Sequence, residues 1–246
     1  MSVVEYSVEN NVGYILLNRP DKRNAINREM FDELEKTIDA AENDNEVKVV
    51  VLKGAGDSFS SGWDLKDSYY LWGPEGMQQW DLGMASSVLR RIEALYMKLW
   101  NLRVPTVAQI KGHAIAAGCY LQLVCDISVA AEDAIFGHPV MQWGGVSSMP
   151  LWQVLLGPKK ARYLLYTSRT IDGKEAERMG LVTMAVPREE VESTVNGIVD
   201  DMLRVPTEGL RHHKEVLNTD LEIMGLGTMY RFHGQHNAFS RVYSYK

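Results

Sequence analysis

The chain of 246 residues lacks several features that would each point to a particular class of protein. It has only two cysteines, Cys119 and Cys125, which is too few for a disulfide framework. Their six-residue spacing in an apolar stretch favours buried thiols over a metal site, so no metal is expected. Lysine and arginine number 26 against 32 aspartates and glutamates, for a net charge of −6. Since no basic stripe is available to bind phosphates, a nucleic acid is not an expected partner.

Long apolar stretches are also missing. The longest runs, such as "VVVL" and "YILL", have the length of a strand and fall far short of a membrane span. The start of the chain, "MSVVEYSVEN", lacks the charged residues and the apolar stretch of a signal peptide. No repeat, low-complexity segment or linker divides the sequence. We therefore expect a cytoplasmic protein with no membrane contact and one dominant core.

The 46% of hydrophobic residues are distributed over alternating strand and helix patterns. "VGYILLN" predicts a strand that ends before Pro20, and "NREMFDELEKTIDAAEND" predicts a helix with one apolar face. "VKVVVLKGAG" is typical of a strand that is covered on both sides. A long amphipathic helix over about residues 77–101 follows, and then strands in "VPTVAQIKG" and "CDISVAAEDAIFG". This alternation indicates an α/β fold.

The last quarter of the chain has a different pattern. From about Val191 the strand patterns cease, and helices are predicted in "STVNGIVDDMLRVP", "GLRHHKEVLNTDL" and "GTMYRFHGQHNAFS". We therefore expect a core domain over residues 1–190 and a helical region over residues 191–246. The last helix carries apolar side chains that little remaining chain can cover: Met229, Tyr230, Phe232 and Phe239. Exposed apolar groups of this kind predict self-association.

Two small-residue turns at strand ends are the first candidates for chemistry. In "SFSSGWDLKD" (58–67), Gly62 allows a backbone conformation that other residues resist, which turns amide hydrogens toward a ligand. In "GHAIAAGCYLQLVCD" (112–126), small residues leave the amides at the start of a helix uncovered, where the helix dipole favours negative charge. One amide from each turn would form a hole for the oxyanion of a reacting carbonyl. Tight packing is the alternative explanation for either turn alone.

These two turns, together with "RPDKRNAIN" (19–27) and "LLGPKKARYLLYTSRTIDGKEAERMGLVTMAVP", resemble the enoyl-CoA hydratase/isomerase (crotonase) superfamily in order and spacing, over nearly the whole chain. The resemblance implies a crotonase (ClpP-like) spiral of ββα units with a C-terminal helical region used for trimerisation. It implies an acyl-CoA thioester substrate, with coenzyme A as part of the substrate and no tightly bound cofactor. A homotrimer or a dimer of trimers is the implied assembly.

The resemblance also assigns residues. The two oxyanion amides fall on Trp63 and on Ala117, where many relatives have glycine. The turn "DKRNA" matches the family's pantetheine- and phosphate-binding turn. The implied coenzyme A contacts are Arg23, Ala25, Ser61, Asp64 and Leu65. By itself, Arg23 would pass for a solvated surface charge.

The sequence departs from the hydratases of the family at two positions. Hydratases have a glutamate at the position of Tyr120 and another at that of Val140, so the carboxylate pair that adds water to a double bond is missing. Three residues are candidates for the missing acid or base. Glu93 is a base if it is desolvated, or a surface residue paired with Arg90. Tyr120 is a hydrogen-bond donor or a packing residue, and His138 is a titrating or a structural histidine.

The segment "GVSSMPLWQVLLG" that follows position 144 is unusual for the family, and it brings Ser147 and Ser148 toward the acyl pocket. Trp72, Trp143 and Trp152 either shape that pocket or belong to the core. The reaction type stays open at this point. It is enoyl-CoA hydration or lyase chemistry, with isomerisation or hydrolysis of an acyl-CoA as alternatives. A non-catalytic acyl-CoA-binding protein that has lost the acid and base is the alternative from another class.

Overall fold

The computed structural model describes residues 2–69, 81–143 and 145–243. Nine strands in this part of the chain form two sheets. The larger sheet has the order β1-β2-β3-β4-β6-β9 and the smaller one the order β5-β7-β8. The large-sheet strands are Val4–Glu9, Val12–Leu17, Val49–Gly54, Thr106–Ile110, Ile127–Ala131 and Met184–Val186. The small-sheet strands are His113–Ile115, Ile135–Gly137 and Thr170–Ile171.

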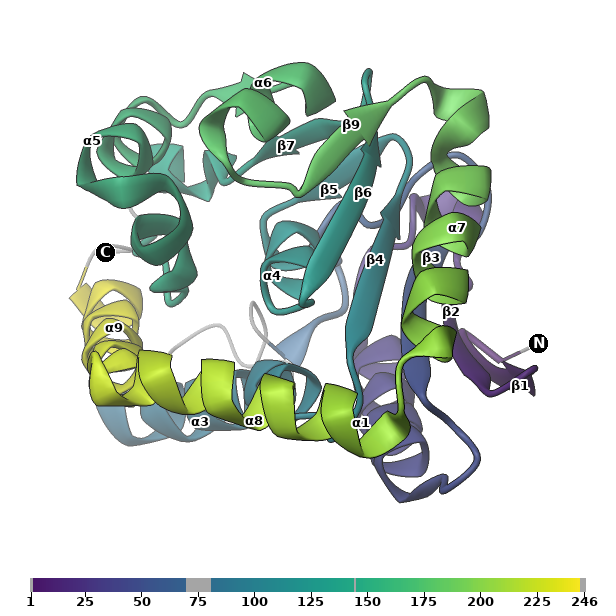
Figure 1. Cartoon of the computed structure of the whole chain (residues 1–246). Helices are drawn as coiled ribbons and strands as arrows, with labels where there is room; N and C mark the ends of the chain where they lie inside the picture. The colour runs from purple at the N-terminus through teal and green to yellow at the C-terminus, as the bar shows by residue number, and fades with distance from the viewer. Residues whose placement is uncertain (1, 70–80, 144, 244–246) are drawn as a thin grey trace.

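The chain repeatedly crosses from one sheet to the other. β4 lies in the large sheet and β5 in the small one, and β6 and β7 repeat that step. From β2 to β9 the large sheet is parallel, and β1 pairs antiparallel to β2 at its edge. Between β4 and β5 the backbone turns at Gly112, which has a positive φ of 58°. The result is the predicted spiral, in which successive turns add a strand to each sheet (Figure 1).

Helices cover both faces of the large sheet, as the continuous apolar pattern of β3 predicts. The four residues Val49–Leu52 are completely buried. On one face, α1 (Arg28–Asn43) packs against β1 and β2, and its predicted apolar face is buried. Its first turn is capped by Asn27, whose side chain accepts a hydrogen bond from the Met30 amide at 2.9 Å. On the other face, α7 (Val191–Arg204) packs against β3, β4 and β6 (Figure 1).

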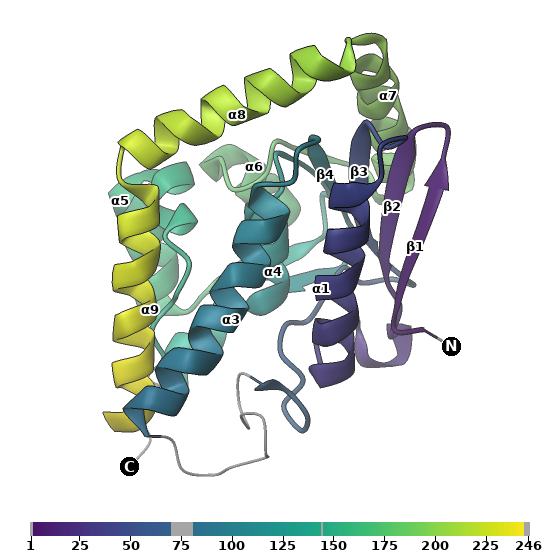
Figure 2. The same cartoon turned by 90° about the horizontal axis from the view of Figure 1, so that it is seen from below.

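Three helices end the chain, and within the described residues no strand follows β9. After α7, α8 (Thr207–Ile223) crosses the molecule, and α9 (Leu226–Tyr243) lies beside α3 (Leu82–Trp100) in Figure 2. The predicted start of α3 at about residue 77 lies outside the described residues. The other helices within the described residues are η1 (Pro20–Lys22), α4 (Ala117–Leu123), η2 (Pro139–Trp143), α5 (Leu151–Thr167), α6 (Gly173–Met179) and η3 (Arg188–Glu190).

One prediction about α9 is wrong. Tyr230 is 5% exposed, because it lies on the side of α9 that packs inward, where its hydroxyl donates to the Met149 sulfur at 3.1 Å. Phe232 and Phe239 are 60% and 45% exposed, as predicted.

The two cysteines are free and buried, as predicted, and burial raises the pKa of each thiol to about 12. Of the helices that the structure describes, none has the length and apolar character needed to span a bilayer.

Candidate active site

The two small-residue turns meet. The Ser60 amide donates to the His113 carbonyl at 2.7 Å, and the Ser60 carbonyl accepts from the Ile115 amide at 3.0 Å. A Cβ atom added to Gly62 would lie 2.7 Å from the Ile115 carbonyl oxygen and 3.3 Å from the Ala117 nitrogen. The two turns therefore lie in direct backbone contact, with Trp63 and Ala117 at their junction. Only glycine fits at position 62.

The backbone on either side of this junction is held by hydrogen bonds. The Ile26 amide donates to the Gly62 carbonyl at 2.7 Å, and the Asp64 amide donates to the Ile26 carbonyl at 2.9 Å, so Trp63 is fixed from both sides. In the second turn, Ala116 has a φ of 50°, a region that favours glycine. Its amide donates to the Gly137 carbonyl at 2.9 Å. A backbone conformation that is disfavoured, but is held in place by surrounding hydrogen bonds, is typical of functional sites.

The amide of Ala117 is the first of α4, where backbone N–H groups have no acceptor within the helix. One turn later, Tyr120 is 5% exposed and packs edge-on against Tyr96 of α3, with ring centroids 5.7 Å apart. The structure therefore places Tyr120 in the first turn of α4, close in sequence to Ala117 at the junction of the two turns.

The Tyr120 hydroxyl belongs to a buried chain of polar side chains. It lies 3.1 Å from His138 Nε2 and 2.7 Å from Ser147 Oγ, and its ring stacks on the imidazole with centroids 5.1 Å apart. His138 is 5% exposed and Ser147 is 4% exposed. Two of the three acid–base candidates of the sequence thus lie together.

Burial lowers the pKa of His138 to about 3, so its imidazole is neutral at neutral pH. A neutral imidazole has one nitrogen that donates and one that accepts. Nε2 faces the Tyr120 hydroxyl, whereas Nδ1 is buried and has no hydrogen-bond partner among the residues that the structure describes. The histidine is therefore neither a cation nor a strong base in this site.

Ser147 was not among the site residues assigned from the sequence. Its hydroxyl accepts a hydrogen bond from the Met149 amide at 3.3 Å, and its carbonyl contacts His233 Nδ1 of α9 at 3.0 Å. The signal in the sequence was the pair of serines in an otherwise apolar segment, but nothing in that segment showed which serine meets Tyr120.

Glu93, the third candidate, lies on the side of α3 that faces α9. Its carboxylate occupies the space beside Gly234, where an added Cβ atom would overlap Oε1. Oε1 is buried without a hydrogen-bond partner in the described part of the chain, and burial raises the pKa of Glu93 to about 7 against the opposing charge of Arg90. Among the described residues Glu93 forms no ion pair with Arg90, and its side chain is half-buried against α9.

A pocket of about 260 Å³ opens beside Glu93 and is lined by Arg90 and Ser86 of α3 and by Arg231 and Gln235 of α9. None of the three tryptophans proposed for the acyl pocket is among the described residues that line this pocket. Trp152 is 1% exposed and belongs to the core. The side chains of Trp72 and Trp143 lie outside the described part of the structure.

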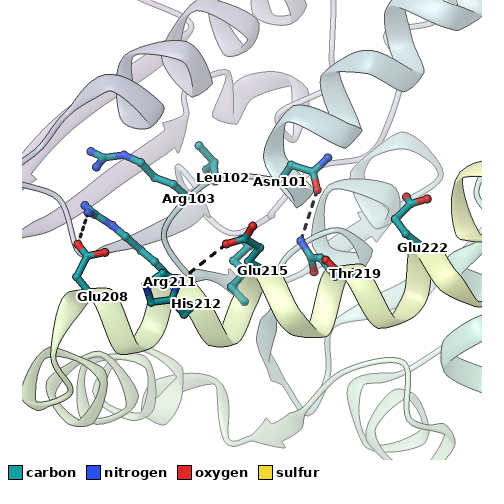
Figure 3. A pocket seen from close by; sticks show the side chains of 11 residues that line it. Asn101, Leu102, Arg103, Glu208, Arg211, His212, Glu215, Thr219 and Glu222 are labelled. Atoms are coloured by element: carbon teal, nitrogen blue, oxygen red, sulfur yellow. Dashed lines mark hydrogen bonds and ion pairs between the residues drawn. The ribbon is translucent and has the colours of Figure 1, made fainter.

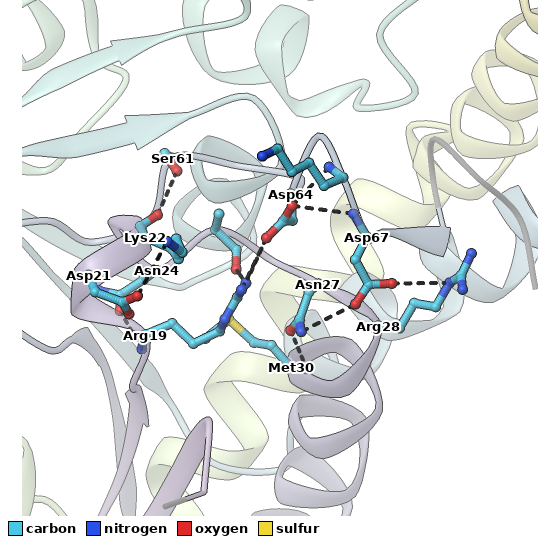
Figure 4. A network of polar contacts seen from close by, with 12 residues as sticks. Arg19, Asp21, Lys22, Asn24, Asn27, Arg28, Met30, Ser61, Asp64 and Asp67 are labelled. Carbon is cyan, nitrogen blue, oxygen red and sulfur yellow. Dashed lines mark hydrogen bonds and ion pairs between the residues drawn. The ribbon is translucent and has the colours of Figure 1, made fainter. Parts of the chain in front are cut away.

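Two of the residues implied as coenzyme A contacts, Ser61 and Asp64, lie in the first turn and join its polar network (Figure 4). Asp64 is bound to the Arg19 guanidinium at 3.1 Å, and its other oxygen accepts from the Lys66 amide at 2.9 Å. These bonds lower the pKa of Asp64 in spite of its partial burial. The Ser61 hydroxyl donates weakly to the Lys22 carbonyl at 3.4 Å. Asp64 thus braces the turn, and its carboxylate is neutralised by Arg19.

Two of the five residues are exposed, and Ala25 is half-buried as Ser61 and Asp64 are. Leu65 is 67% exposed, and Arg23 is exposed and has a left-handed φ of 50°. Arg23 lines a pocket of about 570 Å³ together with His113 and Arg188. Arg23 is therefore positioned to meet an anionic group.

A further groove of about 460 Å³ runs between residues 101–103 and α8 (Figure 3). Most of its lining residues are polar, and some pair with each other, with Arg211 bound to Glu208 at 2.8 Å and Asn218 near Asn101. None of its lining residues comes from the two turns or from the Tyr120 chain.

Comparison with known proteins agrees with this architecture. The model of the enoyl-CoA hydratase/isomerase family matches residues 7–242. The probable enoyl-CoA hydratase echA8 of Mycobacterium bovis is 30% identical over 233 residues, which cover 93% of this chain and 86% of the relative. The hydroxycinnamoyl-CoA hydratase-lyase of Pseudomonas fluorescens is 31% identical over 209 residues, covering 81% and 72%.

Solved structures agree as well. An enoyl-CoA hydratase/isomerase from Xanthobacter autotrophicus Py2 superposes with a TM-score of 0.91 at 28% identity, over 99% of this chain and 88% of that one. A probable enoyl-CoA hydratase from Mycobacterium smegmatis has a TM-score of 0.88 at 30% identity, covering 98% and 95%. The chain belongs to the enoyl-CoA hydratase/isomerase (crotonase) family and is an enzyme of it. The predicted family and fold are confirmed.

Proposed function

We propose that the protein transforms an acyl-CoA thioester and stabilises the enolate or oxyanion with the backbone amides of Trp63 and Ala117. The observation that carries the proposal is the contact of the two turns at Gly62, next to the first amide of α4. Donors fixed in position before the reaction lower the energy of the developing negative charge, and removing one such donor typically costs about 100- to 1,000-fold in kcat.

The coenzyme A part of the substrate would bind along the first turn. Arg23 would meet its phosphates, and Ala25, Ser61, Asp64 and Leu65 would border the pantetheine and adenine. The exposure of Arg23 and Leu65 supports these roles. The role of Asp64 would be carried by its backbone, because its carboxylate is bound to Arg19.

The chemistry proposed is enoyl-CoA hydratase/lyase-like, with Tyr120 as the group that donates a hydrogen bond or a proton. The relatives' names support this class. A tyrosine with a pKa near 10 is a weak base but a competent donor, and Ser147 and His138 hold its hydroxyl in place. Glu93 is the only one of the three candidates with a carboxylate, and burial brings its pKa to about 7, where a general base is effective.

Binding and turnover are tested separately. Coenzyme A thioesters should raise the melting temperature, because a ligand at 100 times its Kd stabilises the native state by about 2.7 kcal/mol. Hydration of crotonyl-CoA should be about 100- to 10,000-fold slower than in a relative that has both glutamates. No thermal shift with several thioesters at millimolar concentration would refute the proposed substrate class, and efficient hydration would refute the argument from Tyr120 and Val140.

An acyl-CoA hydrolase or isomerase is the alternative. The non-catalytic binding protein that the sequence left open is not supported, because the relatives are named as enzymes.

We also propose that the chain assembles into a homotrimer or a dimer of trimers through residues 191–246. Large apolar side chains exposed on α8 and α9 support this assembly.

A further inference from the structure

The pocket of about 260 Å³ beside Glu93 lies between α3 and α9, which pack side by side (Figure 2). Neither the two turns nor α4 contributes to its lining. Leu89 and Gly234 supply buried apolar groups, and Arg90 and Arg231 supply two guanidinium groups. A ligand that combines an apolar part with an anionic group would therefore match this pocket.

The two guanidinium groups have most of their donors available to a ligand. Both side chains are exposed, and within the residues that the structure describes neither forms an ion pair. Arg231 donates one hydrogen bond, to Thr228 Oγ1 at 3.1 Å. The next residue of α3, Arg91, is instead bound to two carboxylates of α1, at 2.7 and 3.0 Å. Of these two consecutive arginines, α3 thus places the one without an ion pair beside the pocket.

Glu93 adds a third polar group to the lining. Its Oε1 is buried against Gly234 without a hydrogen-bond partner among the described residues. Burial raises the pKa of Glu93 to about 7, although the charge of Arg90 opposes the shift, so the carboxyl is largely protonated below neutral pH. The other charged or titratable groups that face it from α9 are Arg231 and Tyr230. A protonated carboxyl carries an O–H donor, which an anionic ligand accepts.

The kind of anion follows from this set of donors. A guanidinium binds either a carboxylate or a phosphate through two parallel hydrogen bonds. A phosphate has acceptor oxygens on every side, whereas a carboxylate has one polar end and continues into an apolar chain. Because Leu89 and Gly234 occupy the pocket wall between the donors, the carboxylate is the better match.

We infer that this pocket binds a carboxylate on a short apolar stem, with Arg90 and Arg231 donating to its oxygens and the protonated Glu93 carboxyl donating to one of them. Glu93 takes part here as a hydrogen-bond donor, a role separate from that of the base considered above. A free carboxylic acid and an acyl group that ends in a carboxylate share this chemistry, and the test separates the two. Only the second source rests on the proposed function.

The first test uses butyrate, with butyramide as an analogue of the same shape that lacks the charge. Isothermal titration calorimetry at pH 6 should show that butyrate binds about 10-fold or more tightly than butyramide or inorganic phosphate, because hydrogen bonds to a charged group are the stronger ones. Arg90→Gln and Arg231→Gln should each weaken butyrate binding about 10-fold. Arg162→Gln on α5 is the matched control, since Arg162 is also exposed and without an ion pair in the described part of the chain, and it should leave the affinity unchanged.

Glu93→Gln tests the proton. Glutamine keeps a donor and carries no charge, so the variant should bind butyrate as the wild type does at pH 6. With a pKa of about 7, roughly one wild-type molecule in ten has a protonated Glu93 at pH 8. The variant should therefore bind butyrate about 10-fold more tightly than the wild type at pH 8. Equal affinities at both pH values would remove Glu93 from the site.

A pair of thioesters identifies the source of the carboxylate. If glutaryl-CoA binds more tightly than valeryl-CoA, and Arg90→Gln abolishes that preference, the carboxylate is the end of an acyl group. Butyrate binding without such a preference assigns the pocket to a free acid. The inference is overturned if neither preference is found, or if both arginine substitutions leave the affinities unchanged. Binding of butyrate but of no thioester would refute the proposed function and leave the carboxylate site standing.

Discussion

The spiral core and the C-terminal helical region differ in how they bury their apolar residues. In the core, strand β3 is covered on both faces, and Val49–Leu52 have no exposed surface. In the helical region, Lys214 is the only buried residue of α8. Four large apolar side chains at or near the end of α8 are more than half exposed: Val216, Leu217, Ile223 and Met224.

The difference indicates two sources of stability. The core supplies the two turns and their amides, and its own packing holds them. The helical region supplies His233 and Tyr230 to the segment around Ser147, but α8 leaves an apolar surface that a second copy of the chain would cover.

The largest difference in activity between the two regions is expected when one methyl group is added at a glycine in each of them. An added Cβ atom at Gly118 would overlap the Ser60 carbonyl oxygen, whereas at Gly197 of α7 it would meet nothing within 4 Å. Gly118→Ala should therefore separate the two turns and lower turnover of an acyl-CoA substrate by about 100-fold or more. Gly197→Ala should retain activity and gain about 0.5–1 kcal/mol in stability. Steady-state kinetics and thermal melts measure both, and equal effects of the two substitutions would remove the distinction between the regions.

A smaller effect, on assembly rather than on the fold of one chain, is expected from charge on α8. Light scattering of the wild-type protein should give a multiple of the 27.8 kDa chain mass. Leu217→Asp combined with Ile223→Asp should shift it to the monomer, because these side chains are 61% and 80% exposed in the single chain and would be desolvated only in an interface. A wild-type monomer at micromolar concentration would contradict the assembly.

The smallest effect concerns the contact between the regions at Glu93. The folded-state pKa is about 7 and the ordinary value is 4.5, so the folded protein holds this proton more tightly than the unfolded chain does. The stabilisation that the protonated Glu93 carboxyl contributes to the folded state is fully present below about pH 4.5 and is lost as the pH rises to about 7. The melting temperature of Glu93→Gln should therefore exceed that of the wild type by a growing margin as the pH rises through this interval.

Parallel melting curves for the two proteins across that range would show that the carboxyl does not titrate there. The same variant tests catalysis, because the amide keeps the shape of the side chain and lacks the base. A loss in kcat without weaker binding would assign Glu93 to the reaction.

Much of the fold could be predicted because its signals are local. The apolar face of α1, the doubly covered strand β3 and the change to helices at residue 191 follow from periodicity over short windows. Strand β1, at the edge of the sheet, was not identified from the sequence, although its residues alternate between buried or half-buried and exposed, which is the period of a strand with one covered face.

The site was predictable only in part. The meeting of the two turns followed from matched motifs, but the partners of Tyr120 depend on residues 18 and 27 positions away in the sequence, and no local pattern encodes such pairings. Tyr230 was misplaced for the same reason, since its burial depends on Met149, 81 positions earlier. Glu93 was left undecided because only the packing of α9 determines whether its carboxylate is solvated.

One buried ion pair joins two parts of the chain that are synthesised at different times. Lys214 of α8, with a side chain that is 6% exposed, binds Asp126 at 2.8 Å and the Val104 carbonyl at 3.1 Å. Asp126 also accepts hydrogen bonds from the amide and hydroxyl of Thr106. During synthesis the strands around Asp126 leave the ribosome 88 residues before Lys214 does. The strands around Asp126 are therefore synthesised before α8, and the Asp126 carboxylate meets its ammonium partner only when α8 packs against them.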